Sequence, residues 1–139
     1  MVKTIEIKVI PNEENEENGL VKFELEGVTD FEFKYLTGSN LGDKSTNKSV
    51  EITISGDLQK DSSSSCKRLA EWAKATSAVS IYRQLEVVYK LKEEIIREYR
   101  FPNAFICDYI EGSKEKEKGY FRAIVMQKFE KIDDIKIKD

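Results

Sequence analysis

Apolar and polar residues alternate strictly over several stretches of the chain, the pattern of β-strands with one buried face. Each stretch in the N-terminal half places three apolar side chains at every second position, with charged or polar residues between them. We expect Phe31, Phe33 and Tyr35, which share one such face, to lie in the core. The predicted strands of this half are residues 4–9, 21–26, 31–35 and 50–54.

A change of period after residue 60 predicts one helix. Cys66, Leu69, Trp72 and Ala73 follow one another at spacings that place them on one helical face. The serines of segment 61–65 precede this pattern, and a serine hydroxyl at that point accepts from a free backbone N–H of the first turn. We expect an amphipathic helix over residues 64–77 with Trp72 packed in the core.

Alternation returns in the second half of the chain. Residues 81–100 tolerate a helix, but their β-branched and aromatic residues favour strands. A turn is expected at 92–94 and an interruption at Pro102-Asn103. The last long stretch is apolar on both faces, so we expect a helix or another subunit to cover its second face. The predicted strands of this half are residues 85–91, 95–101, 104–110 and 120–126.

The elements together predict a mainly β protein of about eight strands and one short α-helix. Such a set suits an antiparallel barrel or a two-sheet sandwich with the helix packed on it. The 139 residues are the length of one domain, and no internal boundary interrupts them, so we predict a single domain over 1–139.

Charge and hydropathy narrow the classes of partner. The formal net charge is -3, and Lys and Glu are scattered along the whole length, so no basic face predicts nucleic-acid recognition. No apolar run approaches the roughly 20 residues needed to cross a bilayer. The N-terminal ten residues carry charges within their apolar pattern and are typical of a strand rather than a signal peptide. We expect a cytoplasmic protein without membrane insertion.

The usual residues of catalysis and metal binding are sparse. The chain has no His, and its two cysteines, Cys66 and Cys107, are far apart in the sequence, which disfavours metal sites and nucleophile–base pairs. Lys44-Ser45-Thr46 lacks the preceding glycine of a phosphate-binding loop. A hydrolase that relies on carboxylates alone is the remaining enzyme hypothesis. We predict no catalytic residue, cofactor or metal.

Two stretches resemble the phage tail-tube proteins and their relatives, the tube proteins of contractile injection systems and the haemolysin-coregulated proteins. Segment 49–58, Ser-Val-Glu-Ile-Thr-Ile-Ser-Gly-Asp-Leu, is followed by Trp72 on a helix, and in these proteins a strand of the type "ITLxRG" precedes a Trp-bearing helix. Segment 98–107 contains Asn103-Ala104 and is similar to their "W-x-x-x-N-A-x-P" strand. The resemblance follows the order of elements over residues 20–130.

This resemblance implies a structural subunit that joins sheet edges with copies of itself into a ring, commonly hexameric, and stacks into a tube. It implies ring and stack neighbours as partners, with sheath or baseplate proteins beside them. The polar strand faces would line a water-filled lumen. Their residues are Glu6, Lys8, Lys22, Glu24, Glu32 and Lys34.

Two segments are expected to make the contacts between copies. The loop 37–48 is polar and unusually long for a loop without structure of its own, and in the resembling family the corresponding loop reaches the adjacent ring. The doubly apolar strand is the second candidate. A small β-barrel adaptor that acts through protein–protein contacts is the alternative. The predicted contact residues are Gly38, Leu41, Gly42, Asp43, Tyr120, Phe121, Ile124 and Met126.

Overall fold

The computed structural model describes residues 2–37, 48–127, 132 and 134–139. Over these residues the chain forms eight β-strands, two α-helices and the 3-10 turn η1. In chain order they are β1 (Lys3–Pro11), η1 (Glu16–Asn18), β2 (Phe23–Leu25), β3 (Val28–Thr37), β4 (Lys48–Leu58), α1 (Ser63–Ala73), α2 (Ala78–Ile81), β5 (Arg83–Leu91), β6 (Glu94–Ser113), β7 (Gly119–Gln127) and β8 (Lys136–Lys138).

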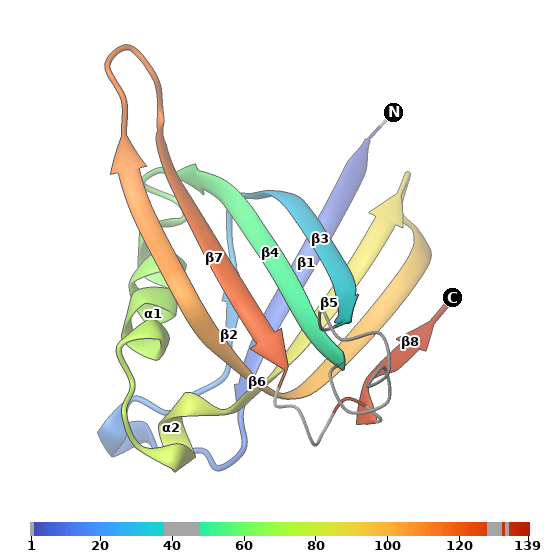
Figure 1. Cartoon of the computed structure of the whole chain (residues 1–139). Coiled ribbons are helices and arrows are strands. Elements are labelled where there is room, and N and C mark those ends of the chain that lie inside the picture. Colours follow the sequence, from blue (N-terminus) through green and yellow to red (C-terminus); the bar gives the residue numbers. More distant parts are fainter. Residues whose placement is uncertain (1, 38–47, 128–131, 133) are drawn as a thin grey trace.

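The strands make one antiparallel sheet in the order β2-β1-β5-β6-β7-β4-β3, and β8 pairs with β6 beside this path (Figure 1). The 20-residue strand β6 joins the two halves of the sheet. Its first half pairs with β5 and its second half with β7. The sheet curls without closing, which confirms the predicted mainly β fold with a helix packed on it.

The core lies inside the curl of the sheet, where the alternating apolar residues meet. The predicted strand faces supply it from both halves, and the helix adds three side chains. Burying one such aliphatic side chain contributes about 1.5–3 kcal/mol. The fully enclosed side chains of the core are Ile7, Val9, Val50, Ile52, Ile54, Cys66, Leu69, Leu85, Val87, Phe101, Ala104, Phe121, Ala123 and Val125.

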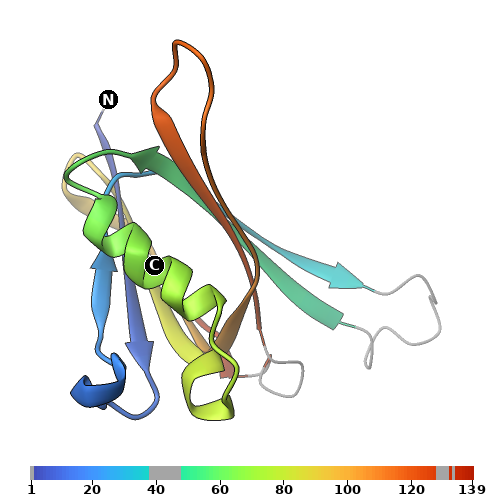
Figure 2. The same cartoon turned by 90° about the vertical axis from the view of Figure 1, so that its left-hand side faces the viewer.

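Helix α1 crosses one side of the sheet and contacts β6 and β2 (Figure 2). Cys66, Leu69 and Trp72 are its buried face, as the spacing predicts. The helix ends at Ala73, four residues before the predicted end. The cause is a tight turn in which the N–H of Ala75 bonds to the carbonyl of Trp72, and the chain then forms α2.

The N-terminus of α1 corrects the capping prediction in part. Ser62 occupies the N-cap position, but its hydroxyl accepts no capping hydrogen bond from the backbone of the first turn. It donates to the carbonyl oxygen of Asp57 over 2.6 Å and accepts from the N–H of Gln59 over 2.9 Å. This serine therefore holds the turn between β4 and the helix.

The expected break at Pro102-Asn103 is wrong, since β6 runs through it. Two residues of β6 face the single residue Gln84 of β5 at this point, which is a β-bulge, and Asn103 has a φ of 56°. A bulge is one of the few places where a strand accepts a proline. The choice of strands for 81–100 is confirmed from Arg83 onward.

Candidate assembly surfaces

The two ends of the sheet are open edges. Within the described part of the chain, β3 has β4 on one side and no strand on the other. At the opposite end, β2 pairs only with the segment Ile7–Val9 of β1, so the preceding residues 3–6 also lack a partner on that side. Such rows of free N–H and C=O groups are templates for pairing with another chain.

Aromatic contacts hold the open strand β3 against the rest of the sheet. The ring of Phe33 lies 5.2 Å from that of Tyr99 and 5.6 Å from that of Phe101, both on β6. Tyr35, two residues on, is 52% exposed although the alternation predicts it in the core. Its partner across the strand pair, Val50 of β4, is fully buried, so Tyr35 is exposed because β3 is the outer strand. An exposed aromatic ring at an open edge is available to a neighbouring chain.

The sheet face opposite the core carries charges that alternate in sign from strand to strand. Lys8 stands across from Glu24 on one side and from Glu86 on the other. Glu86 in turn faces Arg100, and the Arg100 Nε lies 3.6 Å from the carboxylate. Opposite charges at facing positions stabilise a sheet. The positive and negative charges on this face therefore offset one another.

Two further pairs continue this pattern. The ammonium of Lys90 donates to Glu6 over 2.9 Å, and this hydrogen bond raises the pKa of Lys90. Lys34 and Glu51 lie 4.0 Å apart on β3 and β4. The residues predicted on the polar strand faces are exposed, except Glu6, which is half-buried.

Strand β7 carries apolar side chains on both faces, as its sequence suggests, but only one of these faces lies in the core. Phe121 is fully enclosed in the core, whereas Tyr120, Ile124 and Met126 are half-buried on the other face. Facing residues on that side include Thr53 and Glu51 of β4. The apolar strip of β7 thus lies within a mostly polar surface.

The remaining predicted contact residues lie outside the described residues. They are Gly38, Leu41, Gly42 and Asp43.

A third surface was not predicted from the sequence. Ile95 and Ile96 follow the β5–β6 turn and are 50% and 39% exposed, and the neighbouring Val2 is 70% exposed. The N–H of Lys92 bonds to the carbonyl of Val2, which draws the N-terminus to this turn. Adjacent residues of a strand point to opposite faces. The sequence therefore already indicated that one of these two isoleucines lies outside the core.

The described residues hold little that could act as a reactive group. Burial raises the pKa of the Cys66 thiol, and burial also raises the pKa of Tyr109, which donates to Glu111. Among these residues no cluster of three or more His, Cys, Asp or Glu side chains could hold a metal ion. None of their helices is long and apolar enough to span a bilayer.

Comparison with known proteins finds likeness only in structure. No protein-family model matches the chain, and no curated protein matches its sequence. A chain in the sixfold-symmetrised structure of the anti-feeding prophage baseplate is 7% identical, with a TM-score of 0.56 over 96% of this chain and 91% of that one. Hcp1 from Salmonella typhimurium is 11% identical, with a TM-score of 0.55 over 87% and 80%. A type VI secretion system effector from Yersinia pestis is 12% identical, with a TM-score of 0.54 over 98% and 99%.

These matches confirm the resemblance at the level of the fold. The chain has the Hcp-like tube-protein fold, and the match covers nearly all of it. At such low identity the likeness carries the architecture, and the assembly has to be argued from the chain's own surfaces.

Proposed function

We propose that this chain is a structural subunit of a tube in a phage-tail-like or contractile injection particle. The observation that carries the proposal is the pair of open sheet edges on an Hcp-like fold. Each edge offers free backbone donors and acceptors. The two edges are formed by different strands, β3 at one end and β1 with β2 at the other. A contact between unlike surfaces repeats head to tail and closes into a ring when the rotation fits.

In the proposed ring, the outer edge of β3 pairs with the open β1–β2 edge of the next copy. Pairing satisfies the backbone groups of both edges and covers the exposed ring of Tyr35. The sixfold symmetry of the baseplate assembly that contains a similar chain favours six copies. The balanced charges of the face opposite the core suit a water-filled lumen.

Contacts between stacked rings are assigned to the two predicted segments. Loop 37–48 reaches the adjacent ring, and Tyr120, Ile124 and Met126 form the apolar strip that a neighbour covers. Phe121 supports this strip from within the core. Sheath or baseplate proteins are the proposed further partners, and no catalytic step, cofactor, nucleic acid or membrane takes part. Because tubes assemble inside the cell before they act, the subunit is proposed to be cytoplasmic until it enters a particle.

A component that terminates or adapts a tube is the second candidate. The baseplate chain of like fold favours it, since that fold then serves at the end of a particle as well. Such a component would form a ring or bind one, and it would not build a stack of its own.

Cross-linking between the two edges tests the ring directly. One variant carries Lys34→Cys on β3 and the other Thr4→Cys on β1, both in a background in which the exposed Cys107 is serine. The enclosed Cys66 stays in place. With a short bis-maleimide, the mixture of the two variants should give a covalent dimer, because edge pairing brings β3 and β1 of neighbours together.

A matched pair of variants controls for chance collision. It combines Lys34→Cys with Lys118→Cys, which lies in the hairpin between β6 and β7, at a distance from both edges (Figure 1). This pair should give no dimer above background. Equal yields from the two mixtures would contradict pairing of the edges.

A further inference from the structure

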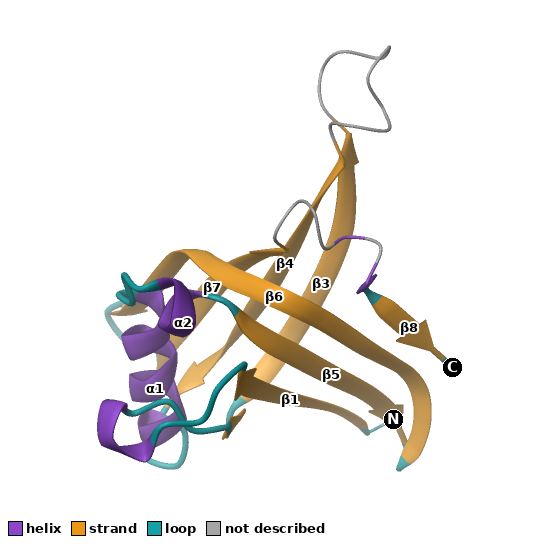
Figure 3. Ribbon diagram, turned by 90° about the horizontal axis from the view of Figure 1, so that it is seen from below, coloured by secondary structure: helices purple, strands orange, loops and turns teal. Residues whose placement is uncertain are grey.

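A hollow lies between α1, α2 and η1, at the end of the molecule where the helical segments gather (Figure 3). Its volume is about 560 Å³. The floor is apolar, with Leu20 and Phe23 nearly buried. Four of its five charged lining residues are basic: Lys67, Arg68, Lys74 and Arg83, against Glu71.

Arg83 is the unusual member of this lining, because only 5% of it is exposed. Its Nε donates to the carbonyl of Ser80 over 2.9 Å, and its guanidinium lies 5.6 Å from the ring centroid of Trp72. Strand β5 begins with this residue and fixes it by pairing with Pro11. The side chain is therefore held in one position.

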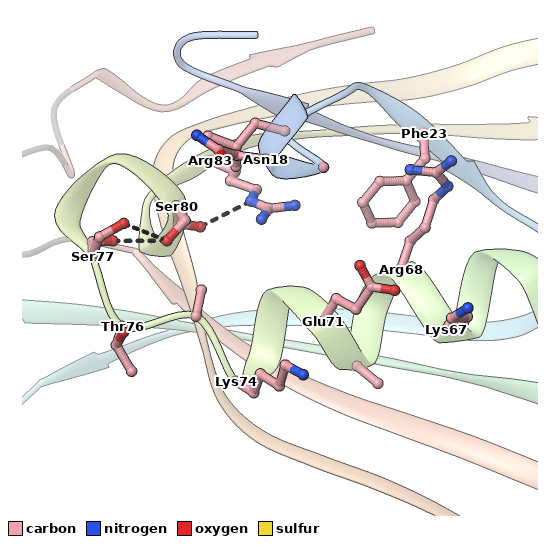
Figure 4. A pocket seen from close by; sticks show the side chains of 14 residues that line it. Asn18, Phe23, Lys67, Arg68, Glu71, Lys74, Thr76, Ser77, Ser80 and Arg83 are labelled. Atoms are coloured by element: carbon pink, nitrogen blue, oxygen red, sulfur yellow. Dashed lines mark hydrogen bonds between the residues drawn. The ribbon is translucent and has the colours of Figure 1, made fainter. Parts of the chain in front are cut away.

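The two terminal nitrogens of Arg83 are available as hydrogen-bond donors to a ligand in the hollow. Among the described residues, none accepts a hydrogen bond from them, and no carboxylate lies within 4.0 Å. Figure 4 shows the guanidinium projecting into the hollow, with Glu71 across from it. Burial lowers the pKa of Arg83, and the negative charge of Glu71 across the hollow opposes this shift.

The chemistry of the free donors selects the ligand group. With Nε engaged, the paired Nη1 and Nη2 form a fork that matches the two oxygens of a carboxylate. Glu71 faces the same space and repels a dianionic phosphate more strongly than a carboxylate, which carries a single negative charge. Glu71 accepts a hydrogen bond in turn, such as the one a peptide N–H beside the carboxylate donates.

The hollow continues into a second one, which indicates an elongated ligand. The two share Asn18, Leu20, Ser77 and Ser80 in their linings, and the second adds Glu13, Glu14 and Val79. Val79 is 48% exposed there. The groove thus runs from a basic end at Arg83, past an apolar side chain, to an acidic end.

We propose that this groove binds a peptide segment of a partner protein, with an acidic residue on Arg83 and a basic residue toward Glu13 and Glu14. The carboxylate accepts two hydrogen bonds from Arg83, and the apolar part of the segment covers Val79. The site lies away from the open edge of β3, whereas Phe23 of its floor belongs to β2, at the edge assigned to ring pairing.

Trp72, the single tryptophan of the chain, reports binding at this site. Its indole N–H donates to the carbonyl of Ile81 over 2.7 Å, directly beside the guanidinium. The experiment titrates the full chain with a fluorescent-labelled, end-blocked hexapeptide that carries one glutamate and, toward its C-terminus, one lysine. Anisotropy measures affinity and Trp72 emission locates the bound peptide. The same peptide with glutamine in place of glutamate is the control, and we expect it to bind roughly tenfold more weakly.

Variants of exposed residues keep the fold intact. Glu71→Gln removes the opposing carboxylate and should tighten binding of the glutamate peptide about threefold at low salt. Glu94→Gln, at the β5–β6 turn, should leave it unchanged. Equal affinity for the two peptides, or binding without a change in Trp72 emission, would overturn the site. Acetate that binds as tightly as the glutamate peptide would overturn its assignment to a peptide.

Discussion

Gly56 lies directly against the backbone of Gly27. A Cβ at this position would overlap the carbonyl of Gly27 and come within 2.8 Å of the ring of Phe121. The two segments are joined here by the N–H of Asp57, which bonds to the Gly27 carbonyl over 2.9 Å. Since Gly27 itself has a φ of 76°, both glycines are required by the geometry of the turn before β3.

Gly56→Ala is therefore expected to lower the free energy of unfolding by about 1–3 kcal/mol, as overpacking does in a rigid core. Urea denaturation followed by the fluorescence of Trp72 measures it. Glu32→Ala, an exposed change on β3, should stay within about 0.5 kcal/mol of the parent. A Gly56→Ala protein as stable as that control would contradict the approach of β4 to Gly27.

The burial of individual residues was the feature least predictable from the sequence. Trp72 could be placed in the core because it repeats the spacing of Cys66 and Leu69. Tyr35 fits its pattern equally well and yet is exposed, because alternation says which face a residue is on and not that its strand lies at the edge of the sheet. Nothing in the sequence indicated that Arg83 is buried, since its burial depends on the turn of α2 and on the position of Trp72.

The β5–β6 hairpin is closed by a two-residue turn of an unfavourable composition. Lys92 and Glu93 have φ values of 52° and 68°, the type I′ geometry that asparagine and glycine adopt most easily. A side chain other than these costs about 1–2 kcal/mol in the left-handed region.

The double change Lys92→Asn with Glu93→Gly should accordingly raise the free energy of unfolding by about 0.5–2 kcal/mol, after the entropy that glycine loses. Thermal unfolding measures it as a higher midpoint. Glu93→Ala keeps the Cβ and should bring no gain. Equal midpoints for the double variant and Glu93→Ala would show that the turn does not have this geometry.

Elements were predictable wherever the period was regular. The strands and α1 follow from alternation and from the spacing of Leu69 and Trp72, because each period fixes which side chains share a face. The break expected at Pro102 failed, since a bulge absorbs a proline without ending the strand. The end of α1 failed because no proline or glycine marks it, and a tight backbone turn stops the helix.

At the scale of the molecule, the sequence predicted a mainly β barrel or two-sheet sandwich with a helix packed on it, but not which strands lie at the edges. Strand order depends on long-range pairing, which composition does not encode. Only the pairing shows that β3 is an outer strand and that β2 leaves part of β1 uncovered. The proposed tube-like assembly follows from the resemblance, and its proposed contact surfaces follow from the strand register.

In the proposed assembly, loop 37–48 makes contacts between stacked rings and takes no part in forming a ring. Replacing residues 38–47 by a short glycine–serine link leaves both sheet edges in place, so rings should still form while stacks are lost. Negative-stain images of the variant beside the parent test this. Loss of the rings themselves would contradict the assignment of the loop to contacts between rings.

The central claim is that the chain assembles with itself, and the mass of the purified protein in solution tests it most directly. Light scattering over a range of concentrations, with negative-stain images of the same sample, should show rings at a multiple of the 16.1 kDa chain mass, with sixfold the proposed value. A 16.1 kDa species at every concentration, without rings in the images, would contradict the account.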